Sequence, residues 1–496
     1  MSNLTLLNLQ ELNLASIAPM LSLIVFGLFI LCIGTFKKDL SRTFYTVFCL
    51  IAIMLNIGIV IDSNRMMSGF FGLMVIDGIS IISQLVILTA SALFIPLALS
   101  TKRFFEYEMS EYYALFLFMI AGFEFMVSSN NLILIFIGLE TSSLALYTLI
   151  ALHNKLKSIE AAIKYFTMGA LGAGFFVFGA AMFYLASGSL EINFTGEVIR
   201  DLNLQDSMVV ILGCVFMFSA IGFKLSLIPF HTWVPDVYEG TNAPLAGYMS
   251  VVPKVAGFIV AMRLFESLAN SGIQWVHDML YISAVLTMTI ANSMALVQRD
   301  VKRMLALSSI AHAGFVLCAI VVGTSGANTA LFLYWIMFLF ANLGAFSMLW
   351  VARCDDTVCW DRRFKHPYEK FAGLIKTLPS YAVIMAIFMV ALAGIPPFSV
   401  FWGKIYLIFA AVASDHIVLA VIMVLNSALA IYYYLKLVVY MFLKEPVVKD
   451  KNLYIANTSN ALKVIVGFAV ITTLTAMLMI NPLLEFIAKF VVASGF

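Results

Sequence analysis

Long apolar segments recur along the whole chain and are separated by mostly short polar gaps. A helix needs roughly 20 mostly apolar residues to cross a bilayer, and these segments are too long for the strands of a membrane barrel. The fourteen segments lie near residues 17–36, 43–61, 78–99, 112–128, 131–152, 165–186, 208–228, 244–265, 274–297, 304–323, 327–352, 380–413, 415–441 and 461–481. The pattern predicts an all-α polytopic membrane protein folded as one compact helical bundle.

Prolines interrupt two of these segments. The seventh runs into "KLSLIPFHTWVPD", with Pro229 and Pro235, and the twelfth contains Pro396 and Pro397. Proline removes a backbone donor and breaks or kinks a helix, and broken spans are tolerated where they are buried or line a wet cavity. The runs "IPFHTW" and "PPFSVFW" form a weak internal echo, as matching breaks in two repeated halves would. We therefore expect helices 7 and 12 to be broken.

Composition supports the membrane assignment and draws attention to the few charges. Hydrophobic residues make up 62% of the chain and charged residues 11%, against about 25% charged residues in soluble domains. Five lysines lie within or close to the apolar segments. Lys436 and Lys463 are nearer helix ends and can snorkel to the surface. Lys224, Lys254 and Lys404 lie deeper, where each costs on the order of 2.5–3.5 kcal/mol.

Acidic residues are rarer within the segments. Glu140 lies in the middle of the fifth segment and is its only carboxylate, whereas Asp77 begins the third segment near its outer edge. One buried lysine can be a packing residue, but several with a glutamate mark a proton or ion route. Desolvation disfavours a charged lysine and a carboxylate restores the charge. A Glu140–Lys224 pair would therefore hold the lysine proton while the pair is made and release it when the pair is broken.

Histidines and cysteines give weaker evidence for a functional site than the buried lysines do. His312 lies well inside a segment and fits either a hydrogen-bonded core histidine or a relay between lysines, since imidazole titrates near physiological pH. His231 follows the break after Lys224. Cys354 and Cys359 share one polar loop without further ligands, which is weak support for a metal or disulfide site. With no phosphate-binding motif and no four-cysteine cluster, the chain itself is expected to hold no metal and no redox cofactor.

The distribution of Lys and Arg predicts the orientation. If the N-terminus is outside, the inward loops hold 20 of these residues and the outward side holds four, namely Arg65, Arg200, Arg263 and Lys489. Because cytoplasmic loops carry the excess of positive charge, both termini are expected outside, which requires an even number of spans. The first residues lack the positive region of a signal peptide, so the first segment is expected to be a retained helix.

Several long runs resemble a known family. They are "LIFIGLETSSLALYTLIAL", "FKLSLIPFHTWVPDVYEGTNAPLAGYMSVVPKVAGF", "DVKRMLALSSIAHAGF" and "LAGIPPFSVFWGKIY". They resemble the antiporter-like subunits of bacterial NADH-quinone oxidoreductase (respiratory complex I), and the resemblance covers nearly the whole chain. It implies two inverted five-helix repeats. The chain would then divide into helices 1–3 (1–111), helices 4–8 (112–265), helices 9–13 (266–441) and a C-terminal loop with helix 14 (442–496).

The resemblance also implies residue roles. The family's glutamate of helix 5 and its lysines of helices 7 and 8 match Glu140, Lys224 and Lys254, and the charged residue of its helix 12 matches Lys404. His231 and His312 would lie on or near the hydrated axis that joins the lysines. Asp77 matches an aspartate near the start of the family's helix 3.

Within the family the N type fits best. The L-type sister has a long C-terminal extension, which this chain lacks, and the M-type sister has glutamate where Lys404 stands. The resemblance implies proton pumping in a bacterial inner membrane, driven by electron transfer in partner subunits that hold flavin, iron–sulfur clusters and quinone. M-type and small K-type membrane subunits would be neighbours, with no nucleic-acid partner. Two alternatives stay open: a sodium/proton antiporter subunit without a redox link, and a membrane scaffold that pumps nothing.

Overall fold

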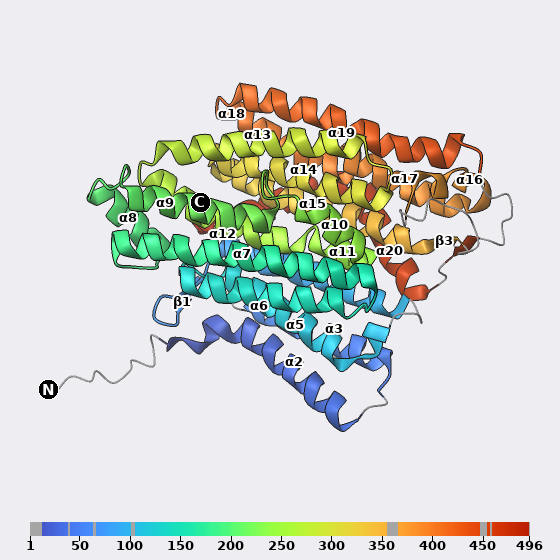
Figure 1. The fold of residues 1–496 in the computed structure, drawn as a ribbon, viewed down its shortest axis with the longest axis horizontal. Helices are drawn as coiled ribbons and strands as arrows, with labels where there is room; N and C mark the ends of the chain where they lie inside the picture. Colours follow the sequence, from blue (N-terminus) through green and yellow to red (C-terminus); the bar gives the residue numbers. More distant parts are fainter. Residues whose placement is uncertain are drawn as a thin grey trace.

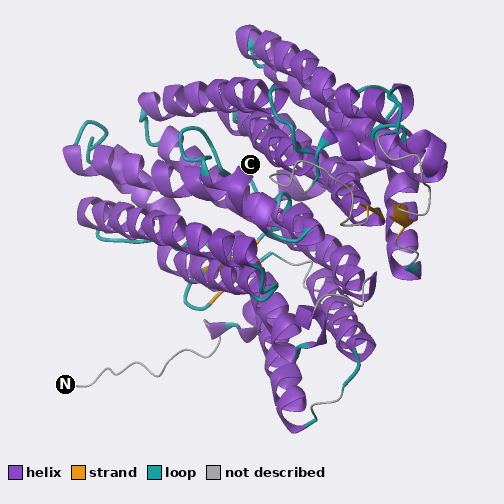
Figure 2. Ribbon diagram, turned by 45° about the vertical axis from the view of Figure 1, so that its right-hand side comes forward, coloured by secondary structure: helices purple, strands orange, loops and turns teal. Residues whose placement is uncertain are grey.

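The computed structural model of the protein describes residues 12–37, 40–62, 66–100, 105–354, 366–446, 454–456 and 459–495. Figure 2 shows that these residues are almost entirely helical. The α-helices up to residue 270 are α2 Ala18–Phe36, α3 Arg42–Asp62, α4 Gly78–Phe94, α5 Ser110–Val127, α6 Leu132–Ala151, α7 Leu156–Ser187, α8 Ile192–Asp201, α9 Met208–Leu225, α10 Trp233–Gly240, α11 Ala243–Met249 and α12 Val252–Asn270. Those that follow are α13 Gln274–Leu296, α14 Val301–Val322, α15 Ser325–Val351, α16 Leu374–Thr377, α17 Pro379–Ala393, α18 Ser399–Ala413, α19 Ile417–Leu443 and α20 Asn460–Ala493.

Short elements complete the described chain. Strands β1 (Met67–Gly69) and β2 (Met74–Ile76) form an antiparallel hairpin, and β3 (Ala352–Cys354) pairs antiparallel with β4 (Tyr454–Ala456). The 3-10 turns are Leu14–Ile17, Ile95–Ser100, Phe105–Glu108 and Tyr368–Phe371.

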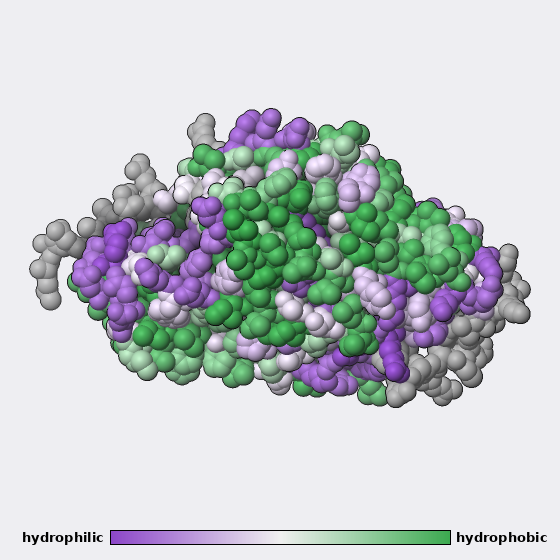
Figure 3. Space-filling view, turned by 90° about the horizontal axis from the view of Figure 1, so that it is seen from above, coloured by the Kyte–Doolittle hydropathy of each residue, from purple (hydrophilic) through white to green (hydrophobic). Residues whose placement is uncertain are grey.

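The number and type of spans agree with the sequence. The described part of the chain has 13 helical stretches long and apolar enough to cross a membrane, one of them made of α11 and α12 together. α17 and α18 are each shorter, and together they occupy the predicted twelfth segment. All fourteen predicted segments are helical, so the polytopic all-α fold is confirmed. Figure 3 shows broad hydrophobic areas on the surface between more hydrophilic margins, as expected for a protein surrounded by lipid.

The helices lie side by side, from the blue α2 at one edge of Figure 1 to the orange α19 at the other. α14 lies near the centre, where it packs against α10, α12, α13, α15, α18 and α19. Almost all of its residues are buried, whereas α2 and α7 expose most of their apolar side chains. A polar side chain on α14 therefore has protein around it rather than lipid. The inverted relation of the two repeats and the four-part division of the chain remain predictions.

Helices 7 and 12 are broken, as predicted. The seventh span is α9 followed by α10, with residues 226–232 between them, and the twelfth is α17 followed by α18, with residues 394–398 between them. At the first break Ser226 has φ 59°, and at the second Gly394 has φ 81°. Left-handed backbone ends a helix, so each break begins at that residue and the prolines follow it.

Helix 8 is also broken, which the sequence analysis did not predict. Residues 244–265 read as one apolar run, but α11 ends at Met249 and α12 begins at Val252. Pro253 explains the interruption, because proline is accepted in the first turn of a helix and disrupts its interior. Two helix boundaries also differ: α7 starts at Leu156 rather than near 165, and α20 continues past Pro482 to Ala493. The short helix α8 was not predicted.

Glycines let helices of the first half approach closely. A Cβ on Gly122 of α5 would lie 2.7 Å from the carbonyl oxygen of Gly138 on α6, and one on Gly138 would lie 2.6 Å from the carbonyl oxygen of Gly122. No side chain larger than hydrogen fits at either position. This contact fixes α6, which carries Glu140, against the interior helix α5.

Part of the charge pattern cannot be placed. Eight of the inward-loop residues lie outside the described residues, namely Lys38, Lys102, Arg103, Arg362, Arg363, Lys365, Lys449 and Lys451. Cys359 lies outside them too, so the loop that it shares with Cys354 is not described. The orientation of the termini remains a prediction.

Candidate functional site

The first buried lysine lies at the end of α9, directly before the break in helix 7. Lys224 is 6% exposed, and its Nζ donates a hydrogen bond to Ser143 Oγ at 2.8 Å. Ser143 belongs to α6 and donates its own hydroxyl hydrogen to Leu139 O at 2.6 Å. Since that hydrogen is occupied, the serine oxygen faces Lys224 as an acceptor. The local fold thus holds the ammonium group against α6.

Glu140 does not contact Lys224 directly. It is partly buried, its Oε1 is buried without a hydrogen-bond partner among the described residues, and no ion pair within 4 Å joins it to Lys224. Its charge acts on Lys224 from a longer distance. The predicted Glu140–Lys224 pair is therefore not a contact pair in this structure. Ser143, one turn further along α6, is the direct partner, and the sequence analysis missed it.

The second buried lysine lies in the first turn of α12, directly after the unexpected break in helix 8. Lys254 is 2% exposed, and its Nζ donates to the backbone oxygen of Ser309 at 2.5 Å and to Ser309 Oγ at 3.1 Å. Ser309 lies on α14, so this contact joins the broken helix to the central one. The ammonium is held by two oxygen acceptors and no carboxylate.

His312 lies one turn after Ser309 on α14 and is bound on both sides. Its Nδ1 is 2.5 Å from the hydroxyl of Tyr334 on α15, and its Nε2 is 3.0 Å from the hydroxyl of Tyr434 on α19. A neutral imidazole has one donor and one acceptor nitrogen, so one tyrosine donates and the other accepts. Both ring nitrogens of His312 are hydrogen-bonded, as in a core histidine. The two tyrosine hydroxyls are also the partners that a proton relay needs. Neither tyrosine was predicted.

The third buried lysine faces the break in helix 12. Lys404 of α18 is 4% exposed and donates to the backbone oxygen of Ala393, the last residue of α17, at 3.0 Å. The carbonyl end of a helix favours a positive charge. A Cβ on Gly394 would lie 2.8 Å from Lys404 Cδ, so the glycine makes room for the lysine as well as ending α17. Lys404 and Lys254 both lie close enough to His312 to interact with it electrostatically.

His231, which was expected to follow the break, lies within it, between α9 and α10. It is 8% exposed, and its Nδ1 is buried without a hydrogen-bond partner in the described part of the chain. Buried polar atoms are normally paired with protein or water. The predicted residues thus fall into two groups: Glu140, Lys224 and His231 by the first break, and Lys254, His312 and Lys404 around α14.

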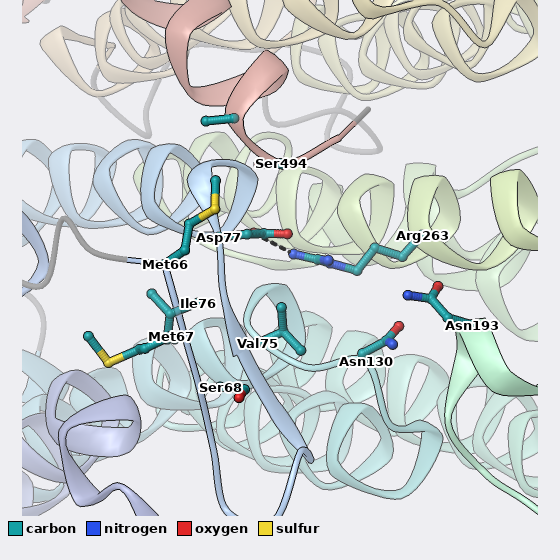
Figure 4. A pocket seen from close by; sticks show the side chains of 11 residues that line it. Met66, Met67, Ser68, Val75, Ile76, Asp77, Asn130, Asn193, Arg263 and Ser494 are labelled. Carbon is teal, nitrogen blue, oxygen red and sulfur yellow. Dashed lines mark hydrogen bonds and ion pairs between the residues drawn. The ribbon is translucent and has the colours of Figure 1, made fainter.

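Two charged residues, Arg263 and Glu124, lie in surroundings that differ from those predicted from the sequence. Arg263 was assigned to the outward loops, but it lies within α12, is 5% exposed and pairs with Asp77 at 2.7 Å (Figure 4). Glu140 was the only carboxylate expected in the middle of an apolar segment, whereas Glu124 of α5 is fully buried as well. It was missed because it stands alone in an apolar run, without a motif around it.

Asp77 caps the N-terminus of α4 and lines a cavity of about 380 Å³. Burial raises the pKa of its carboxyl, but the Arg263 guanidinium and hydrogen bonds from Ser80 lower it by more, so the net pKa lies below its usual range. Figure 4 shows the hairpin residues Met67 and Ser68 among the side chains that line this cavity. Arg263 also donates to Val127 O at 3.4 Å, so the pair fastens α4, α5 and α12 together.

A charged cluster lies at the far end of the broken seventh helix. Arg303 binds Asp236 at 2.9 Å and Glu239 at 2.6 Å, and both acids lie on α10. Lys164 and Lys157 of α7 reach the same two acids at 3.2 and 3.3 Å around a cavity of about 260 Å³. Burial raises the pKa of Asp236, but bonds from Arg303 and Lys164 lower it below its usual range. Asp236 is thus kept ionised.

A metal centre is not supported by the described residues, because no three His, Cys, Asp or Glu side chains gather there in a way that fits a metal ion. The broken helices and buried lysines instead define an antiporter-like membrane protein. Residues 129–430 match the family described as "NADH:quinone oxidoreductase/Mrp antiporter, TM".

Full-length relatives narrow this class. The chain is 70% identical over 496 residues to NADH-quinone oxidoreductase subunit N of Campylobacter concisus (strain 13826), with 100% of both chains covered. It is 55% identical over 496 residues to the subunit N of Sulfurimonas denitrificans, with 99% of each covered. The chain therefore belongs to the NADH-quinone oxidoreductase subunit N family, and the resemblance seen in the sequence is confirmed.

Two solved structures have the same fold as this chain over nearly its whole length. A chain of respiratory complex I from Thermus thermophilus is 28% identical, with a TM-score of 0.79 and coverage of 94% of this chain and 98% of that one. A chain of the archaeal membrane-bound sulfane sulfur reductase has a TM-score of 0.83 at 21% identity, with 97% and 99% covered. At that identity the second match shows the fold alone.

Proposed function

We propose that the chain is a proton-translocating membrane subunit of an NADH-quinone oxidoreductase, respiratory complex I. Electrons pass from NADH to quinone in partner subunits, which hold the flavin, the iron–sulfur clusters and the quinone, and this chain provides a proton route through the membrane. The observation that carries the proposal is the set of three buried lysines, each bound to oxygen acceptors beside a helix break, with His312 near two of them. Intramembrane ionisable groups arranged in this way mark proton paths.

Uptake is assigned to the first break. Glu140 and His231 there have buried polar atoms without partners among the described residues. Such atoms require water, and water supplies protons. Asp236 and Glu239 of α10, which follows the break, add two ion-paired carboxyl groups at the same place. A proton reaching this region loads Lys224, whose charge Glu140 stabilises from a distance.

Proton transfer from the first break toward the second half of the chain passes along α14. Lys254 of α12 binds α14 at Ser309, which lies one turn before His312. His312 has hydroxyl partners on both ring nitrogens, so it can accept a proton on one side and release one on the other. Lys404 receives the proton at the second break and passes it outward. The carbonyl end of α17 favours its charged form.

The proposal also covers the orientation of the subunit in the membrane and the subunits beside it. The subunit crosses the bacterial cytoplasmic membrane with both termini on the periplasmic side, as the excess of Lys and Arg in the inward loops predicts. With Arg263 placed within α12, 20 of these residues are assigned inward and three outward. M-type and small K-type subunits are its membrane neighbours. The sodium/proton antiporter alternative is tested by purification: flavin and iron–sulfur subunits that migrate with the chain would exclude it.

The experiment compares proton pumping in membrane vesicles at equal NADH oxidation and equal assembly. We expect Lys224→Ala and Glu140→Gln to lower the proton-to-electron ratio, because they remove the loaded base and the acid that stabilises it. Lys463→Ala is the matched control, since that lysine lies on α20 with its side chain exposed. If both core variants pump as the wild type does, the proposed route is wrong.

A further inference from the structure

Three buried side chains join α13 to α19 by hydrogen bonds that the lysine route does not use. Asn292 of α13 is 1% exposed, and its Nδ2 donates to Asn426 O at 3.1 Å and to Asn426 Oδ1 at 3.2 Å. Its Oδ1 accepts the hydroxyl hydrogen of Tyr433 at 2.9 Å. A buried amide is costly unless it is hydrogen-bonded, and both polar atoms of the Asn292 side chain are. Asn292, Asn426 and Tyr433 together form what we call the asparagine clamp.

The clamp holds α19 at two levels. Asn426 and Tyr433 both belong to α19, about two turns apart on its buried side, whereas Val421 and Leu425 are exposed on the other side. Apolar side chains do little to fix the height of a helix in a membrane, because lipid tails are as apolar as they are. Hydrogen bonds between helices are directional. The clamp therefore fixes the height of α19 along α13.

α13 is in turn fixed against α14 close to His312. A Cβ on Gly314 of α14, two residues after His312, would lie 2.8 Å from the backbone nitrogen of Met288 on α13. No side chain fits there, so the two helix backbones touch at this point. Met288 lies about one turn before Asn292. The clamp thus begins one turn from the place where α13 meets the helix of the histidine.

The clamp also lies beside the partner of His312 on α19. Tyr433 and Tyr434 are both buried, with ring centroids 4.6 Å apart. The Tyr434 hydroxyl is 3.0 Å from His312 Nε2. A hydrogen bond is lost by about 3.6 Å, so a small shift of α19 would separate these two groups. The distance between them depends on where the clamp holds α19.

We propose that Asn292 is a positioning residue for the proton relay: by binding Asn426 and Tyr433 it sets the height of α19 and keeps the Tyr434 hydroxyl on His312 Nε2. This inference rests on the proposed function, since the relay through His312 is what gives the clamp a role in pumping. Asn292 carries no proton itself, because an amide does not ionise near neutral pH.

Infrared spectroscopy of the purified complex, with 13C-labelled tyrosine, tests the positioning directly. The tyrosine C–O band that Tyr434→Phe removes belongs to Tyr434. We expect this band to shift in Asn292→Leu, because the C–O frequency of a phenol follows its hydrogen bond. Tyr433→Phe keeps the two asparagines and the ring beside Tyr434, so it should assemble readily and shift the band less. A Tyr434 band that stays in place in these assembled variants would overturn the proposal.

Asn56→Leu is the matched control. Asn56 of α3 is also a buried amide that joins two helices, since it donates to Pro19 O at 2.6 Å and to Ser22 Oγ at 3.0 Å, both on α2. α2 lies at the edge of the bundle opposite α19 (Figure 1). The control should change neither the Tyr434 band nor pumping. An equal band shift in Asn56→Leu would show that any lost helix contact moves Tyr434, and Asn292 would then have no special role.

Pumping at equal NADH oxidation and equal assembly tests the consequence. A hydrogen bond between membrane helices contributes about threefold in an equilibrium, so Asn292→Leu should lower the pumping rate about threefold. Added to Tyr434→Phe, it should lower pumping no further, because the contact with His312 is already lost. Effects that multiply would mean that Asn292 acts elsewhere and that the proposal is wrong. If Tyr434→Phe pumps as the wild type does, the relay of the proposed function fails, whereas a band shift in Asn292→Leu would still show that the clamp positions Tyr434.

Discussion

The lysine region of the first break and the histidine network of α14 use similar residue types, but they satisfy their polar atoms differently. In the first region, made of Glu140, Lys224 and His231, two of the three side chains have a buried atom without a partner among the described residues. The histidine network is made of Lys254, Ser309, His312, Tyr334 and Tyr434. In it the lysine nitrogen and both ring nitrogens have an oxygen partner. One region is incomplete without water, and the other is complete within the protein.

This difference fits two tasks. A region that must exchange protons with the aqueous side needs water inside it, whereas a region that must keep protons from leaking is safer when the protein provides every bond. α14, whose residues are almost all buried, provides the second kind of surroundings. We infer that the first break exchanges protons with water and the histidine network carries them across the centre.

The largest expected effect comes from removing the ammonium of Lys254. Lys254→Met keeps an unbranched side chain, one heavy atom shorter, but removes the donor to Ser309 O and leaves the network without a proton carrier. Loss of a positioned proton-transfer group costs about 10²–10⁴-fold, so pumping should be abolished at normal assembly. The measurement is proton uptake by vesicles during NADH oxidation. Pumping at the wild-type ratio in this variant would show that α14 is not part of the proton route and that the two regions do not divide the transfer between them.

A smaller effect is expected from the tyrosine partners. Tyr434→Phe leaves His312 Nε2 buried without a partner, at a cost of about 1 kcal/mol or more, which is about fivefold in rate if this bond lies on the slow step. Tyr334→Phe removes the bond to the other nitrogen and should have a similar effect. Pumping rates of the two variants provide the check. If both pump normally, His312 is a packed core residue and the network is structural.

The sequence predicted the spans and the lysines for clear physical reasons. Twenty apolar residues in a row identify a membrane helix without knowledge of the neighbours, and a lysine within such a run is conspicuous because it is costly. Lys224, Lys254 and Lys404 were therefore found by their cost alone. The breaks at Pro229 and Pro396 were visible because a proline in a helix interior removes a backbone donor and kinks or breaks the helix.

The partners of these lysines were not predictable in the same way. Ser143, Ser309 and Ala393 bind them through a hydroxyl or a backbone oxygen. Such groups occur all along the chain, so only the packing of helices selects one of them. Tyr334 and Tyr434 likewise look like ordinary aromatic residues of membrane helices. Arg263 misled the analysis of charge for the same reason, since its pairing with Asp77 depends on a contact between distant segments.

The smallest expected effect separates the two regions most directly. Ser143→Ala removes the hydroxyl that accepts from Lys224. Because we infer that water reaches this region, a water molecule can replace the serine oxygen, and the change should be at most about 1 kcal/mol. Pumping should therefore fall far less than in Tyr434→Phe, where the protein provides every partner. Vesicle assays of the two variants at equal assembly decide the point. A loss in Ser143→Ala as large as that in Tyr434→Phe would mean that the first region is as dry as the histidine network, and proton uptake would then have to be sought elsewhere.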